Sequence, residues 1–403
     1  MGKPKIRFEG YSEDWEQRKL GDIAEFSKGS GYSKGDLIES GTPIILYGRL
    51  YTKYETSISE VDTYVEAKDG SVYSKGGEVI VPASGETAED IARAATVDKS
   101  GVILGGDLNV VSPNEDINSA FLAISISHGN SKRELAKKAQ GKSVVHIHNE
   151  EIKNLVVPFP AKAEQNKIVE YFSNLDDLIT LHQRKCDETK TLKKYMLQKM
   201  FPQNGEKVPE IRFDGFTEDW EQRKFADFTW DAGKRNKEDL DLEPYAITNE
   251  HGFIRQRDAH DDFGYMKDTD RKAYNIVQPN SFAYNPARIN IGSIGYYKGV
   301  ENVIVSSLYE VFQTDNYVND RFLWHWFKSD EFPRWIERLQ EGSVRLYFYY
   351  DKLCECQLYM PSLEEQEKIA SFLDALDHLI TLHQRKCNEL KEIKKYMLQN
   401  MFV

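Results

Sequence analysis

The eight-residue segment ITLHQRKC occupies residues 179–186 and returns without change at residues 380–387, 201 residues later. Nearer the start, IRFEGYSEDWEQRK at residues 6–19 is matched by IRFDGFTEDWEQRK at residues 211–224, 205 residues later. Repetition at a fixed, long period is the sign of duplicated structural units. The 403-residue chain is therefore a tandem pair of units, each of about 200 residues.

The two copies are alike at their ends and different in their middles. Beyond the matched ends, Asn118 corresponds to Asn319 with the 201-residue shift, whereas residues 26–108 and 228–308 share almost nothing. Neutral drift would spread differences along the whole repeat. Divergence confined to the middles favours one scaffold that carries two different recognition surfaces.

Each copy ends in a long stretch without glycine or proline, which begins after Pro160 in the first copy and after Pro361 in the second. Apolar and small residues recur there at alternating four- and three-residue spacing, which predicts a helix of about 37 residues and about 55 Å with a heptad seam. The seam positions are Leu175, Ile179, His182, Cys186, Thr189 and Met196, and then Leu376, Ile380, His383, Cys387, Leu390 and Met397.

A single amphipathic helix of this length needs a partner for its seam, and the other copy is the obvious one. Because the linker at residues 202–210 holds Pro202, Gly205 and Pro209, it ends the first helix and is short. We therefore expect an antiparallel helix pair, with the second globular domain at the far end of the first helix.

The predicted fold class is α+β: two mixed α/β globular domains, related by a pseudo-twofold, are separated by a long antiparallel two-helix coiled-coil spacer. The expected parts are a first recognition domain (1–160), a central spacer helix (161–201), a linker (202–210), a second recognition domain (211–361) and a C-terminal spacer helix (362–403). Strands are expected at 76–84, 101–113, 280–286 and 301–313, and short helices at 118–127, 131–142, 319–328 and 331–342.

Composition excludes several classes of protein. The chain has 29% charged and 40% hydrophobic residues, so it is neither disordered nor fibrous. It holds no run of about 18 apolar residues and no apolar signal core, so we expect no membrane span. Four cysteines do not form a disulfide framework, which favours free thiols and a cytoplasmic location.

Motifs for catalysis and metal binding are missing from the sequence. The segment AKKAQGKS at 136–143 has alanine where a phosphate-binding loop needs its first glycine, and neither HExxH nor paired CxxC occurs. His146 and His148 alternate along an expected strand, so we interpret them as partly exposed strand residues, not metal ligands. Cys354 and Cys356 alternate similarly and are interpreted as packing residues. An enzymatic function is therefore not expected.

The repeated openings WEQRKLGDIAEF (15–26) and WEQRKFADF (220–228) resemble the specificity subunits of Type I restriction-modification systems. The segments AEQNKIVEYFSNLDDLITLHQRK (163–185) and EEQEKIASFLDALDHLITLHQRK (364–386) resemble the same family at the same positions. The resemblance covers the whole chain. It implies two target-recognition domains, each of which reads one half of a split site in double-stranded DNA, and paired helices that fix the gap.

The resemblance also implies partners. Two modification subunits would bind S-adenosylmethionine and methylate adenine, and two restriction subunits would act as motor-nucleases with ATP and magnesium. This chain itself would bind no cofactor or metal and would catalyse nothing. Two alternatives remain at this point: a bivalent protein-binding adaptor of the same shape without DNA recognition, and an enzyme with an unrecognised site.

Base-reading residues are expected in the divergent loops, since Arg, Lys, Asn, Gln, Ser and Thr suit base edges. In the first unit the loops at 29–36, 46–54 and 82–87 supply Tyr47, Arg49, Lys53, Ser84, Glu86 and Thr87. In the second unit the loops at 248–257 and 285–293 supply Asn249, His251, Arg255, Arg288, Asn290 and Ser293. Lys142, Ser143 and Arg345 belong to glycine turns expected to approach the DNA backbone. Alignment of Pro82-Ala83 with Pro286-Ala287 predicts that Ser84 and Arg288 share one readout position.

The net charge of −12 does not exclude DNA as a ligand, because affinity follows local phosphate contacts and not the total charge. The segment 131–142 holds five basic residues against one glutamate. Divergent loops rich in basic and aromatic residues favour the DNA-binding interpretation over the adaptor.

Overall fold

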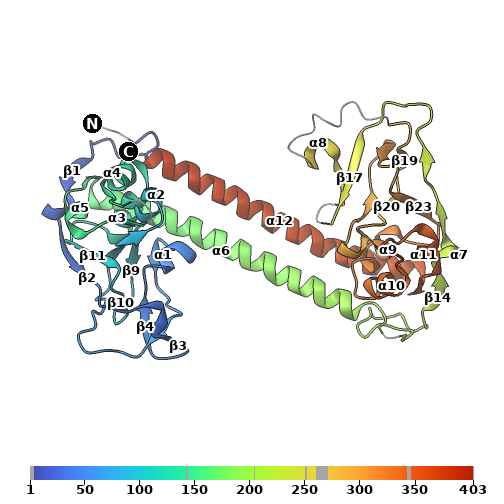
Figure 1. The fold of residues 1–403 in the computed structure, drawn as a ribbon, viewed down its shortest axis with the longest axis horizontal. Helices are drawn as coiled ribbons and strands as arrows, with labels where there is room; N and C mark the ends of the chain where they lie inside the picture. Colours follow the sequence, from blue (N-terminus) through green and yellow to red (C-terminus); the bar gives the residue numbers. More distant parts are fainter. Residues whose placement is uncertain are drawn as a thin grey trace. The chain divides into compact units, whose positions relative to one another are not determined.

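The chain forms two compact units whose division runs through its two long helices (Figure 1). Unit 1 contains Met1–His182 and Arg385–Val403, and unit 2 contains Gln183–Gln384. Helix α6 spans Lys162–Lys199 and α12 spans Leu363–Met401. Each unit therefore combines the body of its own repeat with the C-terminal part of the helix from the other repeat. The computed structural model describes residues 4–141, 144–203, 205–249, 252–259, 271–342 and 346–402.

Unit 1 is built on a mainly antiparallel core sheet, in which only the edge pair β5–β9 is parallel, with helices packed against it (Figure 1). The five-stranded sheet has the order β2 (Ala24–Lys28), β11 (Leu108–Pro113), β7 (Glu78–Pro82), β9 (Ala95–Val97) and β5 (Ser57–Ile58). A four-stranded sheet has the order β10 (Ile103–Leu104), β4 (Thr42–Ile45), β6 (Tyr64–Val65) and β3 (Leu37–Ile38). Two short pairs join β1 (Glu16–Lys19) to β13 (Val156–Phe159), and β8 (Ser84–Gly85) to β12 (Val145–His146). The helices are α1 (Arg49–Thr52), α2 (Ala88–Ile91), α3 (Ser119–Ser127), α4 (Gly129–Lys138) and α5 (Asn149–Lys153).

Unit 2 uses the same scheme with different strands in its middle. A four-stranded sheet has the order β15 (Thr229–Asp231), β23 (Glu310–Thr314), β20 (Ser281–Tyr284) and β21 (Ile294–Tyr297). A five-stranded sheet has the order β16 (Lys234–Arg235), β19 (Asn275–Val277), β22 (Val303–Val305), β17 (Pro244–Thr248) and β18 (Gly252–Arg255), and β14 (Glu221–Lys224) pairs with β24 (Gln357–Met360). The helices are α7 (Phe225–Phe228), α8 (Gln256–Ala259), α9 (Asp320–Trp326), α10 (Glu331–Leu339) and α11 (Tyr350–Glu355).

The four short helices predicted between the strands and the long helices are confirmed as α3, α4, α9 and α10. Two predicted strands are divided in the structure. Residues 101–113 form β10 and β11 around a turn at 105–107, and residues 301–313 form β22 and β23 around a turn at 306–308. In both cases a short turn, Gly105-Gly106-Asp107 in unit 1 and Ser306-Ser307-Leu308 in unit 2, interrupts the apolar run. The prediction joined the apolar residues on the two sides of the turn into one strand and overlooked the turn signal.

The same asparagine begins the helix after the core sheet in both units. The Asn118 side chain accepts a hydrogen bond from Phe121 N at 3.1 Å, and the Asn319 side chain accepts one from Phe322 N at 3.0 Å. A side-chain acceptor at this position satisfies a backbone donor that the helix leaves unpaired. The capping role explains why this residue is identical in both copies.

Each core is completed by the aromatic residue at the end of the other repeat's helix. In unit 1, Phe402 packs against Phe121 with ring centroids 5.8 Å apart. In unit 2, Phe201 packs against Phe322 with centroids 5.3 Å apart. Phe121 is the repeat equivalent of Phe322, and Phe201 is that of Phe402. All four side chains are buried. Burial of large aromatic rings contributes strongly to stability, so the helix ends anchor the units.

The long helices also contact each other within each unit. Cys387 Sγ lies 4.0 Å from Ile179 O in unit 1, and Cys186 Sγ lies 3.8 Å from Ile380 O in unit 2. Both cysteines are buried, and neither forms a disulfide within the described part of the chain. The buried seam positions are Leu175, Cys186, Leu376, Cys387 and Leu390. Of the helices in the described part of the chain, none combines the length and apolarity that a membrane span requires.

Candidate nucleic-acid interface

The three loops singled out in the first unit meet at the turn formed by residues 105–107. Ser30 bridges to Gly105, and Gly105 N donates to Ile45 O at 2.9 Å, at the start of the loop that contains Tyr47. Ser84 Oγ donates to the carboxylate of Asp107 at 3.4 Å. A Cβ atom on Gly29 would lie only 1.9 Å from Gly105 O, so this close approach requires glycine. The structure thus gathers loops that are far apart in sequence.

The Arg49 side chain is buried in unit 1 and makes its hydrogen bonds within that unit. Only 9% of it is exposed, and its guanidinium donates to Asp62 Oδ1 at 2.6 Å and to Glu55 Oε2 at 2.7 Å. Lys53 Nζ donates to the same carboxylate of Asp62 at 2.8 Å. Hydrogen bonds from Lys53 and Arg49 lower the pKa of Asp62 to about 2. Because the guanidinium is buried and its Nη1 and Nη2 groups donate inside the domain, we do not retain Arg49 as a base-reading residue.

The other predicted residues of unit 1 lie near the surface. Tyr47, Glu86 and Thr87 are exposed, and Ser84 is half-buried in β8. Thr87 caps α2, since its Oγ1 accepts from Asp90 N at 3.1 Å. The loops containing Tyr47 and Ser84 are joined directly, because Tyr51 OH donates to Ser84 O at 2.9 Å.

Arg93 is a residue of this cluster that the sequence interpretation missed. Its guanidinium lies 5.8 Å from the ring centroid of Tyr51 and 5.2 Å from that of Tyr54, and it donates to Leu50 O at 2.9 Å. These contacts hold the segment around α1 against α2. Nothing in the spacing of Arg93 pointed to this role, because its partners are about 40 residues away.

In unit 2 the two predicted loops are packed together. Ser293 is 3% exposed, and its Oγ donates to Ile247 O at 2.9 Å. Gly292 has a φ of 87° and lies beside Asn249. A buried hydroxyl that is already hydrogen-bonded does not reach a base, so Ser293 joins the loops and is not retained as a reading residue.

Asn249, Arg255, Arg288 and Asn290 are exposed. Arg255 Nε donates to Tyr245 OH at 3.4 Å, and this hydrogen bond raises the pKa of Arg255. A cation that the sequence interpretation missed stands beside these loops. Lys328 Nζ lies 3.4 Å from Gly292 O and 4.6 Å from the Trp324 ring centroid, and burial lowers its pKa to about 8.

The predicted equivalence of Ser84 and Arg288 is wrong by one residue. Ile147 N donates to Ala83 O at 3.1 Å, and its repeat equivalent Phe348 N donates to Pro286 O at 3.1 Å. Ala83 therefore matches Pro286, and Arg288 matches Gly85. The alignment failed because a proline-alanine pair occurs in both copies at positions shifted by one. Lys142, Ser143, His251 and Arg345 lie outside the described residues.

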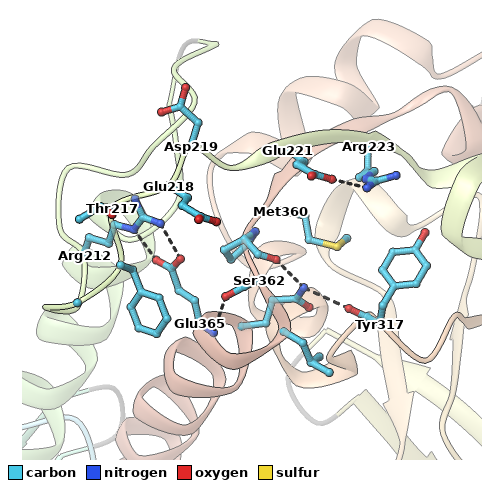
Figure 2. A pocket seen from close by; sticks show the side chains of 15 residues that line it. Arg212, Thr217, Glu218, Asp219, Glu221, Arg223, Tyr317, Met360, Ser362 and Glu365 are labelled. Carbon is cyan, nitrogen blue, oxygen red and sulfur yellow. Dashed lines mark hydrogen bonds and ion pairs between the residues drawn. The ribbon is translucent and has the colours of Figure 1, made fainter.

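Unlike the loops, a polar pocket is repeated almost unchanged in the two units. Figure 2 shows the pocket of unit 2. It has a volume of about 400 Å³ in unit 2 and about 390 Å³ in unit 1. Arg212 donates to both carboxylate oxygens of Glu365, at 2.7 and 2.9 Å, and Arg7 donates to both oxygens of Glu164 at 2.7 Å. A bidentate pair fixes both partners, so each one ties the first segment of its unit to the start of a long helix.

The pocket wall consists of segments that the repeat preserves. In unit 2 it includes Glu218, Asp219, Glu221 and Arg223, and Figure 2 shows Glu221 paired with Arg223. The matching residues in unit 1 are Glu13, Asp14, Glu16 and Arg18. The two units thus share this pocket although their loops differ.

A group of acidic and histidine side chains in unit 2 has the composition of a metal site but not its surroundings. Ligand atoms of His325, Asp374 and Asp377 all lie within 4.8 Å of one another. However, Arg321 pairs with Asp374, and Lys193 Nζ lies 2.5 Å from Asp377 Oδ1. Burial opposes ionisation of Asp374, but hydrogen bonds from His325 and Arg321 outweigh it and lower its pKa. The group is a charge network that joins α9 to the long helices.

Comparison with known proteins also finds two copies of one domain in this chain, in agreement with the two repeated scaffolds. The model of the Type I restriction modification DNA specificity domain matches residues 12–191 and, separately, residues 217–392. The chain belongs to the Type I restriction-modification DNA specificity family.

Relatives of this family match the chain along almost its whole length. The Type I restriction enzyme MjaVIII specificity subunit of Methanocaldococcus jannaschii is 21% identical to this chain. The match covers 96% of this chain and 91% of the length of that subunit. The putative Type I restriction enzyme MjaX specificity subunit of the same organism is 24% identical, with coverage of 96% and 92%.

Solved structures share the fold. The S subunit of a Type I restriction-modification system from M. genitalium has a TM-score of 0.63 at 13% identity, covering 100% of this chain and 99% of its own. A chain from a structural study of Type I complex assembly and conformational transition has a TM-score of 0.51 at 16% identity, covering 96% and 97%. Membership of this family makes the chain a non-catalytic specificity subunit, and DNA recognition prevails over the adaptor alternative.

Proposed function

We propose that this specificity subunit directs a Type I complex to a bipartite site in double-stranded DNA, with each unit reading one half. The observation that carries the proposal is the contrast between the loops and their scaffold. Caps, core aromatic residues and pocket are equivalent in the two units, whereas the loops around Ser84 and Arg288 differ in sequence and in strand pattern. A scaffold that keeps its frame and changes its loops is suited to reading two different half-sites.

The loops offer the chemistry that base reading needs. Exposed Tyr47 and Lys53 in unit 1, and Asn249, Arg288 and Asn290 in unit 2, are hydrogen-bonding side chains that lie outside the α-helices and β-strands. Arginine recognises guanine and asparagine recognises adenine through paired hydrogen bonds. Other side chains in these loops, such as Arg49 and Ser293, hold the loops in place.

We infer that α6 and α12 form the spacer that sets the gap between the half-sites. Their 38 and 39 residues correspond to about 57 Å of helix. Support comes from the buried seam residues and from the anchoring of both helix ends in the cores. Because the ends of these helices are anchored in the cores of the two units, the length of the helices would set the distance between the two DNA-reading surfaces.

A surface that occurs once in each unit can bind two copies of the same partner, one on each unit. We propose that the repeated pockets and the nearby helix faces receive two modification subunits, which bring S-adenosylmethionine, and that two restriction subunits bring ATP and magnesium. The matching ion pairs Arg7–Glu164 and Arg212–Glu365 support this, because they give both units the same rigid wall.

The proposal is tested by exchanging one recognition domain. Residues 20–150 are replaced by the corresponding segment of another family member, and genomic methylation is mapped in cells that also express the modification subunit. We expect one half of the methylated site to change and the other half and the gap to stay the same. A change in both halves would contradict the assignment of one half-site to each unit.

A further inference from the structure

Each unit has a pair of aromatic rings whose planes are nearly parallel, and the two pairs lie at equivalent positions of the repeat. In unit 1 the rings of His146 and His148 have centroids 6.4 Å apart and planes 9° apart. In unit 2 the rings of Tyr347 and Tyr349 have centroids 5.6 Å apart and planes 4° apart. The 201-residue shift relates each histidine to one of the tyrosines. The repeat thus preserves an aromatic pair but changes its hydrogen-bonding groups.

The backbone that carries each pair is the same. Gln140 and His146 exchange two backbone hydrogen bonds of 3.0 and 2.8 Å, and Glu341 and Tyr347 exchange two of 2.8 and 2.7 Å. Between the two rings of each pair lies one fully buried residue, Ile147 or Phe348. Because side chains alternate along an extended segment, burial of the middle residue places both rings on the outer face.

The face that carries the two rings of each pair contributes little to the hydrophobic core of its unit. His146, His148 and Tyr349 are exposed, the last to 46%, and Tyr347 is half-buried. The buried residue between the rings supplies the packing at this point of each unit. An aromatic pair that occurs at the same place in both copies, on a face that the core does not use, is available for contact with a ligand.

Both pairs border the divergent loops. His146 is the cross-strand partner of Ser84, which donates to Asp107 in the turn where the loops of unit 1 meet. Phe348, between the two tyrosines, donates its N–H to Pro286, two residues before Arg288. Each ring pair therefore flanks the segment in which base-reading residues of its unit are proposed.

We propose that each ring pair contacts the DNA of the half-site read by its own unit and helps to determine which bases are accepted there. This inference rests on the proposed function. The ring faces are suited to deoxyribose and thymine methyl groups, and the imidazole nitrogens or phenolic hydroxyls are suited to phosphate oxygens and base edges. The change from two histidines to two tyrosines alters donors and acceptors while the flat surface stays, as expected where two half-sites differ.

The test uses the full chain assembled with its modification subunit. The probe is a fluorescent duplex that carries the bipartite site defined by methylation mapping of the wild-type complex, with point-mutated half-sites as competitors. Y347A/Y349A is expected to raise Kd about fivefold or more and to weaken base preference in the second half-site alone. H146A/H148A is expected to do the same for the first half-site alone.

Two further variants separate a lost contact from a lost fold. Y347H/Y349H places the histidine pair of unit 1 on the equivalent segment of unit 2 and is expected to change base preference there without loss of partner assembly. Trp230→Ala removes an aromatic side chain of unit 2 that is 48% exposed and outside the pair, and should bind like wild type.

The inference is overturned if the alanine and histidine variants of the tyrosine pair both keep wild-type Kd and base preference in a wild-type complex that discriminates between sites. If the wild-type complex binds the intact and mutated duplexes equally well, the proposed function itself fails. These two results are distinguished by the wild-type measurement alone.

Discussion

Lys394 Nζ lies 2.5 Å from Asp176 Oδ1 in unit 1, and Lys193 makes the equivalent 2.5 Å contact with Asp377 in unit 2. In each case the lysine comes from the C-terminal part of one long helix and the aspartate from the N-terminal part of the other. The lysines are repeat equivalents, and so are the aspartates. The ion pairs therefore join each repeat to the helix that the other repeat contributes.

Exchange of the charges in one pair should be tolerated better than reversal of either charge alone. Lys394→Asp or Asp176→Lys brings like charges together, whereas the double variant restores an attraction. Because 42% of the Asp176 side chain is exposed, we expect a coupling energy of only about 0.5–1 kcal/mol. Urea unfolding of the four proteins of the double-mutant cycle measures it.

The control for this cycle is Arg184–Glu188, an exposed pair within α6. Its coupling energy should be about 0.3 kcal/mol. Equal coupling energies for the two pairs would show that the contact between the helices adds nothing to an ordinary surface pair.

Arg288 and Arg49 should respond to alanine substitution in opposite ways. Arg288 is exposed, so Arg288→Ala should change stability by no more than about 0.5 kcal/mol. If Arg288 reads guanine, discrimination at one base pair of the second half-site should fall by about 1–3 kcal/mol. Arg49→Ala should cost about 1–3 kcal/mol of stability, because it removes a buried side chain that donates hydrogen bonds to Asp62 and Glu55.

Competition binding with point-mutated duplexes and urea unfolding measure the two effects. Partner assembly should be normal for Arg288→Ala. Wild-type preference at every base pair would remove Arg288 from the reading residues.

Lengthening the first long helix should lengthen the gap in the DNA site. Four residues inserted after Thr189 add about 6 Å of helix and advance the seam by about 400°, which keeps it nearly in phase. We expect the same two half-sites with a gap longer by about 1–2 base pairs, at about 3.4 Å per pair. Methylation mapping measures the gap, and circular dichroism shows whether helix content is kept.

A control insertion of four residues after Gly70, in an exposed turn of unit 1, should leave the gap unchanged. If helix content survives the Thr189 insertion and the original gap is still methylated, the partner subunits set the spacing instead of the helices.

His128 should make unit 1 less stable in mild acid. Burial lowers its pKa to about 4, and the positive charges of Lys132, Lys394 and Arg93 act in the same direction. Unfolded histidine has a pKa of about 6.5, so the unfolded chain binds more protons between about pH 4 and 6.5. The stability contribution is therefore complete above about pH 6.5 and is lost as the pH falls.

The expected loss from this group is about 2 kcal/mol between pH 7.5 and pH 5. His128→Asn should flatten the decrease, as measured by urea unfolding at both pH values. His378→Asn, at an exposed position on α12, should keep the wild-type slope. An unchanged slope in His128→Asn would show that other groups cause the acid sensitivity.

The loops show why the candidate site was only partly predictable. Arg49 and Arg288 are the same residue type in divergent loops, yet one is buried between two carboxylates and the other is exposed. Ser293 is polar but buried, and Arg93 and Lys328 were not selected. Their surroundings depend on partners that lie far away in the sequence, so local composition carries little information about them. The ring pair of Tyr347 and Tyr349 was missed for the same reason, because stacking depends on burial of Phe348.

The sequence by itself determined the duplication, the two long helices, their seam residues and the family resemblance. These features follow from identity at a fixed shift and from a heptad period maintained over nearly 40 residues, which local residue order is sufficient to show. Only the tertiary structure decided which helix end completes which core, as Phe402 does for unit 1, and which loop side chains are exposed. Those outcomes depend on packing between residues hundreds of positions apart, where burial of apolar surface and pairing of polar groups are set by the whole fold.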